Sequence, residues 1–73
     1  MTNSTEKIIS DNIKYYRKLK NLTQEKLSEI CDISQDYLSE IERGKKMPSL
    51  KRLIKISNGL EIEPYLLLKA RVE

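Results

Sequence analysis

The sequence predicts an all-α fold, a compact arrangement of five short helices. Apolar residues recur at spacings of three and four along most of the chain, as on the inward face of a helix. Serine or threonine precedes each of the first four apolar runs, where its hydroxyl can accept a hydrogen bond from an amide at the helix start. Strand signals are missing, because no sustained alternation occurs and the chain holds one Val and no Phe or Trp. At 73 residues the chain forms at most one domain, with a thin core.

The first helix is expected to begin near residue 5 or 6, with Ser4 or Thr5 as its cap. It should end at Asn21, because Asn tolerates the left-handed conformation of a helix end. Its predicted inward residues are Ile9, Ile13 and Tyr16. The second helix is expected to begin after Thr23, whose side chain can cap it. Its predicted inward residues are Leu27 and Ile30.

A short turn at residues 32–33 should lead into the third helix, which Ser34 caps and Gly44 ends. Its predicted inward residues are Leu38 and Ile41. By subtraction, the residues that face outward on one side are Gln35, Asp36, Ser39, Glu40 and Arg43.

The fourth helix is expected to follow Ser49 as its cap. Its predicted inward residues are Leu50, Leu53, Ile56 and Leu60. Pro64 suits the first turn of a fifth helix, which we place over residues 63–73. Pro and Gly are rare, with two of each, so the connections between helices should be short.

Charge is distributed unevenly along the chain, although the formal net charge is only +3. Two basic segments, residues 14–20 and 43–55, contain four and six Lys or Arg residues and no acid. Between them, residues 23–42 set one Lys against six acids, a net charge of −5. Basic segments suit the backbone of a polyanion. The alternative is a set of solvated helix faces, which is the origin of most charge runs in soluble proteins.

The chain lacks the residues of several functional classes. It contains no His and a single cysteine, Cys31, so neither an internal disulfide nor a zinc site is expected. We predict that this cysteine is a small buried residue. No nucleophile paired with a base, Gly-rich phosphate loop or metal-ligand cluster is present, which argues against an enzyme. No cofactor, metal or small-molecule ligand is expected. A single thiol suits a reducing cytosol and no spanning apolar run is present, so we expect a cytoplasmic protein outside the membrane.

The middle of the chain carries specific motifs. I-x-x-x-R at Ile13 and Arg17 is followed by LTQEKLS at residues 22–28 and by DISQDYLSEIERGKKMPS at residues 32–49. These motifs resemble the phage-repressor and Cro-like helix-turn-helix family, and the resemblance runs from about residue 9 to residue 68. It implies a five-helix, lambda-repressor-like DNA-binding domain over residues 9–68, with the helix-turn-helix at about residues 24–43.

The resemblance also implies roles for single residues. Gln24, at the start of the second helix, would anchor a phosphate beside the helix N-terminus. On the third helix, the residues nearest to base edges would be Gln35, Asp36, Ser39 and Glu40, and those near the DNA backbone Ser34 and Tyr37. The next phosphates would be held by Arg43, Lys45 and Lys46. Arg17 and Glu42 match a pair that in similar proteins forms a buried ion pair between the first and third helices.

Three positions at which similar proteins commonly place glycine hold Asn21, Asp32 and Glu61. Asn and Asp adopt the left-handed conformation at modest cost, while Glu does so less readily. The fold should tolerate these residues, with marginal stability as the result.

The acidity of the third helix has two interpretations. Asp36 and Glu40 lie four residues apart on the outward face, where a carboxylate repels phosphates but can accept a hydrogen bond from cytosine N4. We interpret them as selectivity devices, because they penalise binding to most sequences. The alternative is that they only lower affinity for DNA, or that this face meets a protein.

The C-terminal segment predicts self-association. Leu67 is expected to close the core, which leaves an uncovered apolar stripe on the helix over residues 63–73. The residues of that stripe, with Leu66 at its edge, are Tyr65, Leu68 and Val72. Exposed apolar area on so small a protein usually marks a partner, and a symmetric homodimer is the simplest one.

Together these features favour a transcriptional regulator, either a repressor or a controller protein. It would bind a palindromic double-stranded DNA operator as a homodimer, with the third helix in the major groove. The alternative is a protein–protein interaction module or an antitoxin with the same fold. An enzyme is the weakest hypothesis. The salt dependence of duplex binding separates the first two, because counterion release from DNA gives a steep slope.

Overall fold

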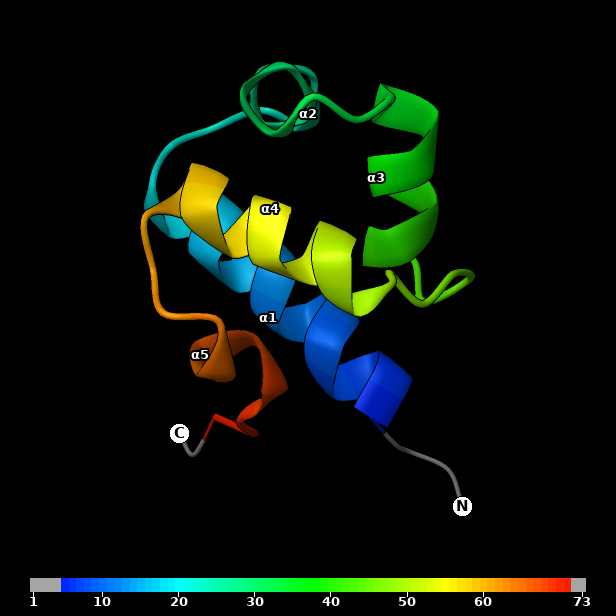
Figure 1. Cartoon of the computed structure of the whole chain (residues 1–73), viewed down its shortest axis with the longest axis vertical. Coiled ribbons are helices and arrows are strands. Elements are labelled where there is room, and N and C mark those ends of the chain that lie inside the picture. Colours follow the sequence, from blue (N-terminus) through cyan, green and yellow to red (C-terminus); the bar gives the residue numbers. More distant parts are fainter. Residues whose placement is uncertain (1–4, 72–73) are drawn as a thin grey trace.

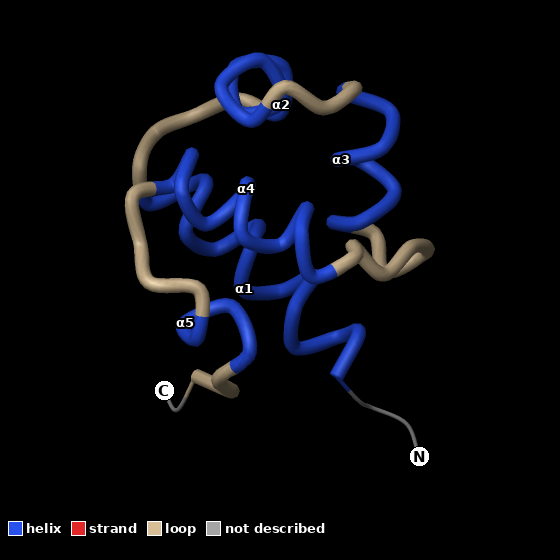
Figure 2. The backbone as a smooth tube through the Cα atoms, in the orientation of Figure 1, coloured by secondary structure: helices blue, strands red, loops and turns tan. Residues whose placement is uncertain are grey.

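The computed structural model describes residues 5–71, which form five helices and no strand (Figure 1). The helices are α1 (Thr5–Leu19), α2 (Gln24–Cys31), α3 (Gln35–Glu42), α4 (Leu50–Leu60) and α5 (Tyr65–Leu68). The all-α prediction is therefore confirmed. Helices α1 and α4 cross in the middle of the molecule, α2 and α3 lie on one side of this pair, and α5 lies on the other (Figure 1). The connections between helices are short (Figure 2).

Three of the helices begin directly after a hydroxyl residue, as predicted. The side-chain oxygens of Thr23, Ser34 and Ser49 each accept a hydrogen bond from the amide three residues later, at 3.0, 3.0 and 3.2 Å. Each bond satisfies one of the amides that a helix start leaves without a partner inside the helix, which is worth about 1 kcal/mol. The first helix begins at Thr5, and its other predicted cap, Ser4, lies outside the described residues.

Helix ends occur where the chain turns left-handed. Asn21, Asp32 and Glu61 have φ angles of 60°, 58° and 59°, and Gly44, after α3, has φ of 76°. At Asp32 and Glu61 the backbone amides donate to carbonyls of the preceding turn and close the helix. A side chain in this conformation costs up to roughly 1–2 kcal/mol relative to glycine, so the fold tolerates three such sites at some cost in stability.

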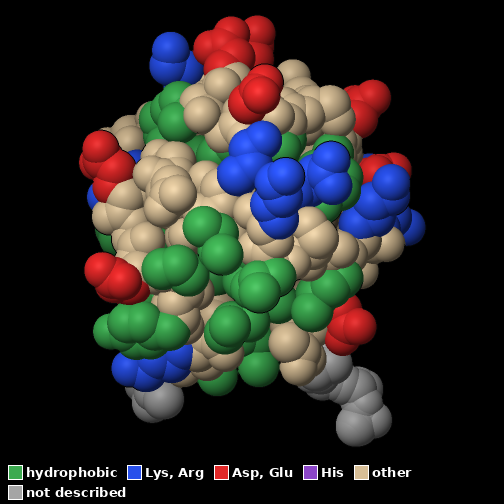
Figure 3. Space-filling model, in the orientation of Figure 1, with side chains coloured by type: hydrophobic (Ala, Val, Ile, Leu, Met, Phe, Trp, Pro, Cys, Tyr) green, Lys and Arg blue, Asp and Glu red, His purple; other side chains and the backbone are tan. Residues whose placement is uncertain are grey.

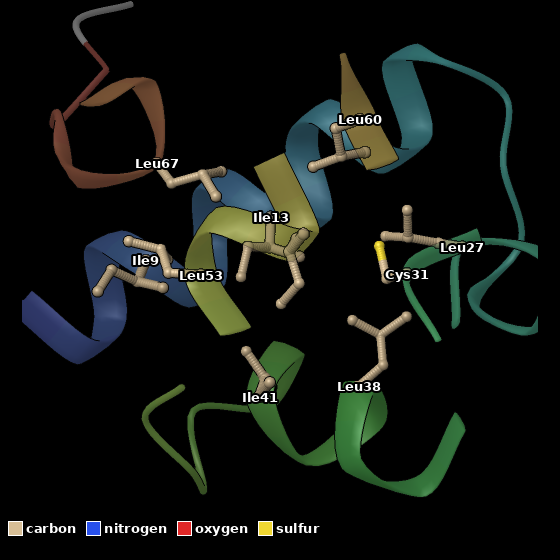
Figure 4. Packing of buried hydrophobic residues seen from close by; sticks show 10 residues of the cluster. Ile9, Ile13, Leu27, Cys31, Leu38, Ile41, Leu53, Leu60 and Leu67 are labelled. Atoms are coloured by element: carbon tan, nitrogen blue, oxygen red, sulfur yellow. The ribbon is translucent and has the colours of Figure 1, made fainter. Parts of the chain in front are cut away.

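The core is formed by side chains from all five helices, which point toward a common interior (Figure 4). Its buried apolar residues are Ile9, Ile13, Leu27, Cys31, Leu38, Ile41, Leu53, Ile56, Leu60 and Leu67. Gly59 allows α2 and α4 to approach closely, because a Cβ there would lie 2.5 Å from the Sγ of Cys31. Burial of Leu67 brings α5 into the same core, as the sequence predicted.

Two predictions of inward residues were wrong. Ile30 is 48% exposed and Leu50 is 71% exposed. On α2 the core-facing stripe joins Leu27 to Cys31, four residues later, and Cys31 packs against Gly59 of α4. Leu50 occupies the first turn of α4, where no helix covers it, and Leu53 takes the inward place one turn later.

The C-terminal helix is shorter than the predicted range of 63–73. Helix α5 ends at Leu68, and Lys69 is extended, with φ of −98° and ψ of 123°. The side chain of Asn12, which is buried on α1, donates to the carbonyl oxygens of Leu67 at 3.0 Å and of Lys69 at 2.8 Å. These carbonyls therefore bond to α1 instead of continuing the helix. Val72, the last residue of the predicted stripe, lies outside the described residues.

The segment after α5 is held along α1 by two further contacts. The Nε of Arg71 donates to the Oδ1 of Asn12 at 3.0 Å. Its guanidinium also lies 3.8 Å from the centre of the Tyr15 ring, a cation–π distance. The Asn12 amide thus uses both donors and its acceptor on one segment more than 50 residues away in sequence.

Candidate nucleic-acid interface

Helices α2 and α3 are joined by a three-residue turn, residues 32–34. The amide of Ile33 donates to the carbonyl of Ser28 at 3.0 Å, which closes the end of α2 before the chain enters α3. On α3, Leu38 and Ile41 are fully buried and fix its inner face. The opposite face therefore lies toward solvent, and the predicted outward residues are all exposed or partly exposed: Gln35, Asp36, Ser39, Glu40 and Arg43.

The end of α3 is attached to α1 by an ion pair. Arg17 donates from Nε to the Oε2 of Glu42 at 2.7 Å and from Nη2 to Oε1 at 3.0 Å, a bidentate geometry. Its Nη1 donates to the carbonyl oxygen of Leu22 at 2.7 Å. Both side chains are largely buried, Arg17 at 11% and Glu42 at 2% exposure, so water screens the attraction little. The structure thus brings together the two residues that the sequence analysis paired.

Gln24 joins the same cluster. Its Nε2 donates to the Oε1 of Glu42 at 3.0 Å, so this carboxylate accepts three hydrogen bonds from two helices. The family resemblance implies a phosphate contact for Gln24, and this bond to Glu42 was not predicted. No local pattern could have indicated it, because the two residues are 18 positions apart and meet only through the packing of α2 on α3.

The outward acids of α3 differ in their surroundings. Glu40 lies 3.4 Å from the Nζ of Lys46 in the loop after α3, whereas no ion pair involves Asp36 within residues 5–71. The Glu40–Lys46 pair is exposed to solvent and contributes little to stability. It does place a cation directly beside a predicted base-contacting residue. No pattern in the sequence predicts this pair, because the path of the loop decides it.

The ring of Tyr37 lies close to two cations. The Nζ of Lys46 is 5.8 Å from the ring centre, and the Cζ of Arg52 on α4 is 5.3 Å from it. The ring is partly buried and packs against the core. A concavity of about 580 Å³ opens here, and its lining consists of Asp32, Ile33, Ser34, Asp36, Tyr37, Glu40, Lys46 and Arg52. Arg52 was not among the site residues predicted from the sequence.

Basic side chains gather on one part of the surface. Figure 3 shows Lys and Arg side chains clustered over the start of α4 and the loop between α3 and α4. Arg43, Lys45 and Lys46 in this region are all exposed. The predicted phosphate-contacting residues of the loop therefore lie next to the predicted base-contacting face of α3, as a duplex-binding surface requires.

Cys31 is buried, and its burial raises the pKa of the thiol above its ordinary value, while the positive charge of Lys55 lowers it by a smaller amount. A protonated, buried thiol is a poor nucleophile. Within residues 5–71, no group of three or more His, Cys, Asp or Glu side chains is arranged to hold a metal ion. No helix in that range has the length and apolar character needed to cross a membrane.

A capped helix, a three-residue turn and a second capped helix, packed on three others, define a helix-turn-helix protein. The family model described as helix-turn-helix matches residues 13–67, and the chain belongs to this family. It is a member of the phage-repressor and Cro-like group of helix-turn-helix transcription regulators.

Among its relatives is the control protein C.BamHI of Bacillus amyloliquefaciens, which is 39% identical over 65 residues covering 88% of this chain and 80% of that protein. The crystal structure of the restriction-modification controller protein C.AhdI of Aeromonas hydrophila is similar, with a TM-score of 0.82 and 29% identity over 85% of this chain and 94% of that chain. A second similar structure is that of the controller protein C.Esp1396I, a tetramer in complex with its natural 35 base-pair operator. It has a TM-score of 0.83 and 30% identity over 90% of this chain and 87% of that chain.

The buried ion pair leads to a prediction about stability. Glu42→Ala leaves the buried Arg17 without its carboxylate and should lower the free energy of unfolding by roughly 3–5 kcal/mol. Thermal melting followed by circular dichroism measures the loss. The matched control is Glu29→Ala, which removes a glutamate from the exposed Lys26–Glu29 pair and should cost less than about 1 kcal/mol. Equal melting temperatures for the two variants would contradict this account of the pair.

Proposed function

We propose that this chain is a sequence-specific transcriptional regulator that binds a palindromic DNA operator as a homodimer, with α3 in the major groove. The observation that carries the proposal is the surface of α3. Its inner face is fixed by fully buried side chains and its C-terminal end by a buried ion pair, while its outer face is polar and open. A rigidly held helix with a free polar face suits insertion into a major groove.

Base contacts are assigned to the outward residues of α3, namely Gln35, Asp36, Ser39 and Glu40. A glutamine can bond adenine through two hydrogen bonds, and a carboxylate can accept a hydrogen bond from cytosine N4. Backbone contacts are assigned to Gln24, Ser34, Tyr37, Arg43, Lys45 and Lys46. The relative C.Esp1396I, which forms a complex with operator DNA, supports this assignment of partner.

A second candidate function is a protein-interaction module or an antitoxin that uses the same fold. The net charge of −5 over residues 23–42 favours it, because an acidic face suits a basic protein partner. The geometry weakens this argument, since Arg17 neutralises Glu42 inside the protein and Lys46 lies beside Glu40. Fewer of the six acids therefore contribute negative charge to the surface than the sequence suggests.

The assignment of contacts predicts two classes of variant. Gln35→Ala and Glu40→Ala should relax base preference at one or two positions of each half-site, because they remove groups that face base edges. Lys45→Ala should weaken binding to all sequences alike and reduce the salt slope by about one unit. Selection of bound duplexes from a random pool, followed by sequencing, measures both effects. An unchanged motif for both Gln35→Ala and Glu40→Ala would mean that α3 does not contact bases.

The homodimer is proposed from exposed apolar surface near the C-terminus. Tyr65 is 60% exposed and Leu68 is 48% exposed, while Leu66 is partly buried beside them. On α4, Leu50 and Ile54 are also exposed, one helical turn apart. Figure 3 shows hydrophobic side chains gathered over α4 and α5 on one face of the molecule. An apolar surface of this kind on a small protein suits a second copy of the chain.

The geometry of DNA supports the same arrangement. One helix contacts only a few base pairs, whereas two helices related by a dyad contact half-sites about 34 Å apart, one turn of the duplex. Because α5 lies on the opposite side of the α1–α4 pair from α2 and α3, pairing near α5 leaves both copies of α3 free (Figure 1).

A charge placed in this surface tests the dimer. Leu68→Glu should bring two carboxylates together across the dyad and yield a folded monomer with much weaker operator binding. Leu19→Glu is the matched control, because Leu19 is also an exposed leucine, on α1 (60%), outside the proposed interface. Sedimentation equilibrium measures assembly in each variant. A parent that stays monomeric at high micromolar concentration, or a Leu68→Glu variant that still dimerises, would contradict the proposed interface.

A further inference from the structure

We propose that Tyr37 holds Arg52 and Lys46 as a two-cation clamp for the phosphodiester backbone of duplex DNA, at the edge of α3. This inference rests on the proposed function. It adds Arg52, a residue of α4, to the DNA-binding surface, and it gives the aromatic ring of Tyr37 the role of positioning two cations.

Three segments of the chain meet at this clamp. Tyr37 comes from the first turn of α3, Lys46 from the loop that follows α3, and Arg52 from the first turn of α4. Both cations lie within the distance of about 6 Å at which a ring face attracts them. The ring is partly buried against the core and belongs to a helix turn that Ser34 caps, so it forms a fixed support for two flexible, exposed side chains.

The two cations of the clamp differ in their partners. Lys46 lies 3.4 Å from Glu40, but within residues 5–71 no carboxylate forms an ion pair with the guanidinium of Arg52. Three carboxylates, of Asp32, Asp36 and Glu40, also line this concavity, so an anion must be held here by direct bonds to the cations and not by the net charge of the lining. A phosphate matches this requirement, because the planar fork of arginine can bond two of its oxygens.

The position of the clamp suits the backbone rather than the bases. Arg52 and Lys46 line the same concavity as Asp36 and Glu40, which are assigned to base edges. When the outer face of α3 lies in a major groove, cations that lie beside this face, on the loop after α3 and on α4, meet the sugar–phosphate chain at the edge of the groove. A cation there adds affinity for every sequence and fixes the position of α3 in the groove.

The test uses salt titrations of the parent protein and its variants against the duplex that the parent enriches most from a random pool. Arg52→Gln should reduce the salt slope by about one unit, so that the ratio of affinities at 50 and 200 mM salt falls roughly three- to fourfold. Lys51→Gln removes the same charge from the adjacent exposed residue, for which no bonded partner is found within residues 5–71. It should change the slope by less than about half a unit.

The role of the ring is tested by a double-variant cycle. Tyr37→Phe keeps the ring and should leave the effect of Arg52→Gln intact. Tyr37→Leu removes the ring and should weaken binding by itself, and adding Arg52→Gln to it should then have little further effect. Thermal melts of each variant check that the protein is folded.

Each failure has a distinct meaning. A parent that binds no duplex in a salt-dependent manner would overturn both the proposed function and the clamp. A parent that binds DNA, with Arg52→Gln and Lys51→Gln lowering the slope equally, would overturn the clamp alone. Full additivity of Tyr37→Leu and Arg52→Gln would overturn the positioning role of the ring.

Discussion

The buried carboxylate of Glu42 joins three of the five helices. Arg17 of α1 donates two hydrogen bonds to it and Gln24 of α2 donates a third, while Glu42 itself ends α3. A buried charge is tolerated only when its hydrogen-bonding groups are satisfied, so the helices must keep the positions that bring these donors together. The apolar core alone determines which side chains are buried, but it does not fix the orientation of each helix. The ion pair adds the geometric requirement that fixes the C-terminal end of α3.

The function that we propose depends on this constraint. With its inner face in the core and its last residue bonded to α1 and α2, α3 presents its polar face as a rigid unit. The loop after α3 and the start of α4 then carry exposed cations close to that face. The structure also explains part of the acidity of residues 23–42. Glu42 is buried and pairs with Arg17, and Glu40 pairs with Lys46 on the surface. An acidic segment in sequence is therefore compatible with a surface that binds a polyanion.

Local signals in the sequence predicted most of the fold, and the errors lie where distant contacts decide. Hydroxyl caps and apolar spacing placed the starts of α2, α3 and α4, since both act within a few residues. Ile30 was misplaced because the packing of α2 against α4 buries Cys31 and leaves Ile30 half exposed. The end of α5 was misplaced because Asn12 binds the carbonyls of Leu67 and Lys69 from the other end of the chain. In the candidate site, the helical periodicity of α3 predicts its outward residues. The place of Arg52 beside Tyr37 could not be predicted in this way, because it depends on the position of α4 relative to α3.

The most direct test of the account is the selection of duplexes from a random pool by the parent protein, followed by sequencing of the bound fraction. Two copies of α3 held about the dyad of a homodimer should enrich an inverted repeat, with half-site centres separated by about 10 base pairs or a multiple of that spacing. Recovery of such a repeat is the result that the account predicts. A pool with no enriched motif, or an enriched motif without two-fold symmetry, would contradict the proposal that this chain binds an operator as a symmetric pair of helix-turn-helix domains.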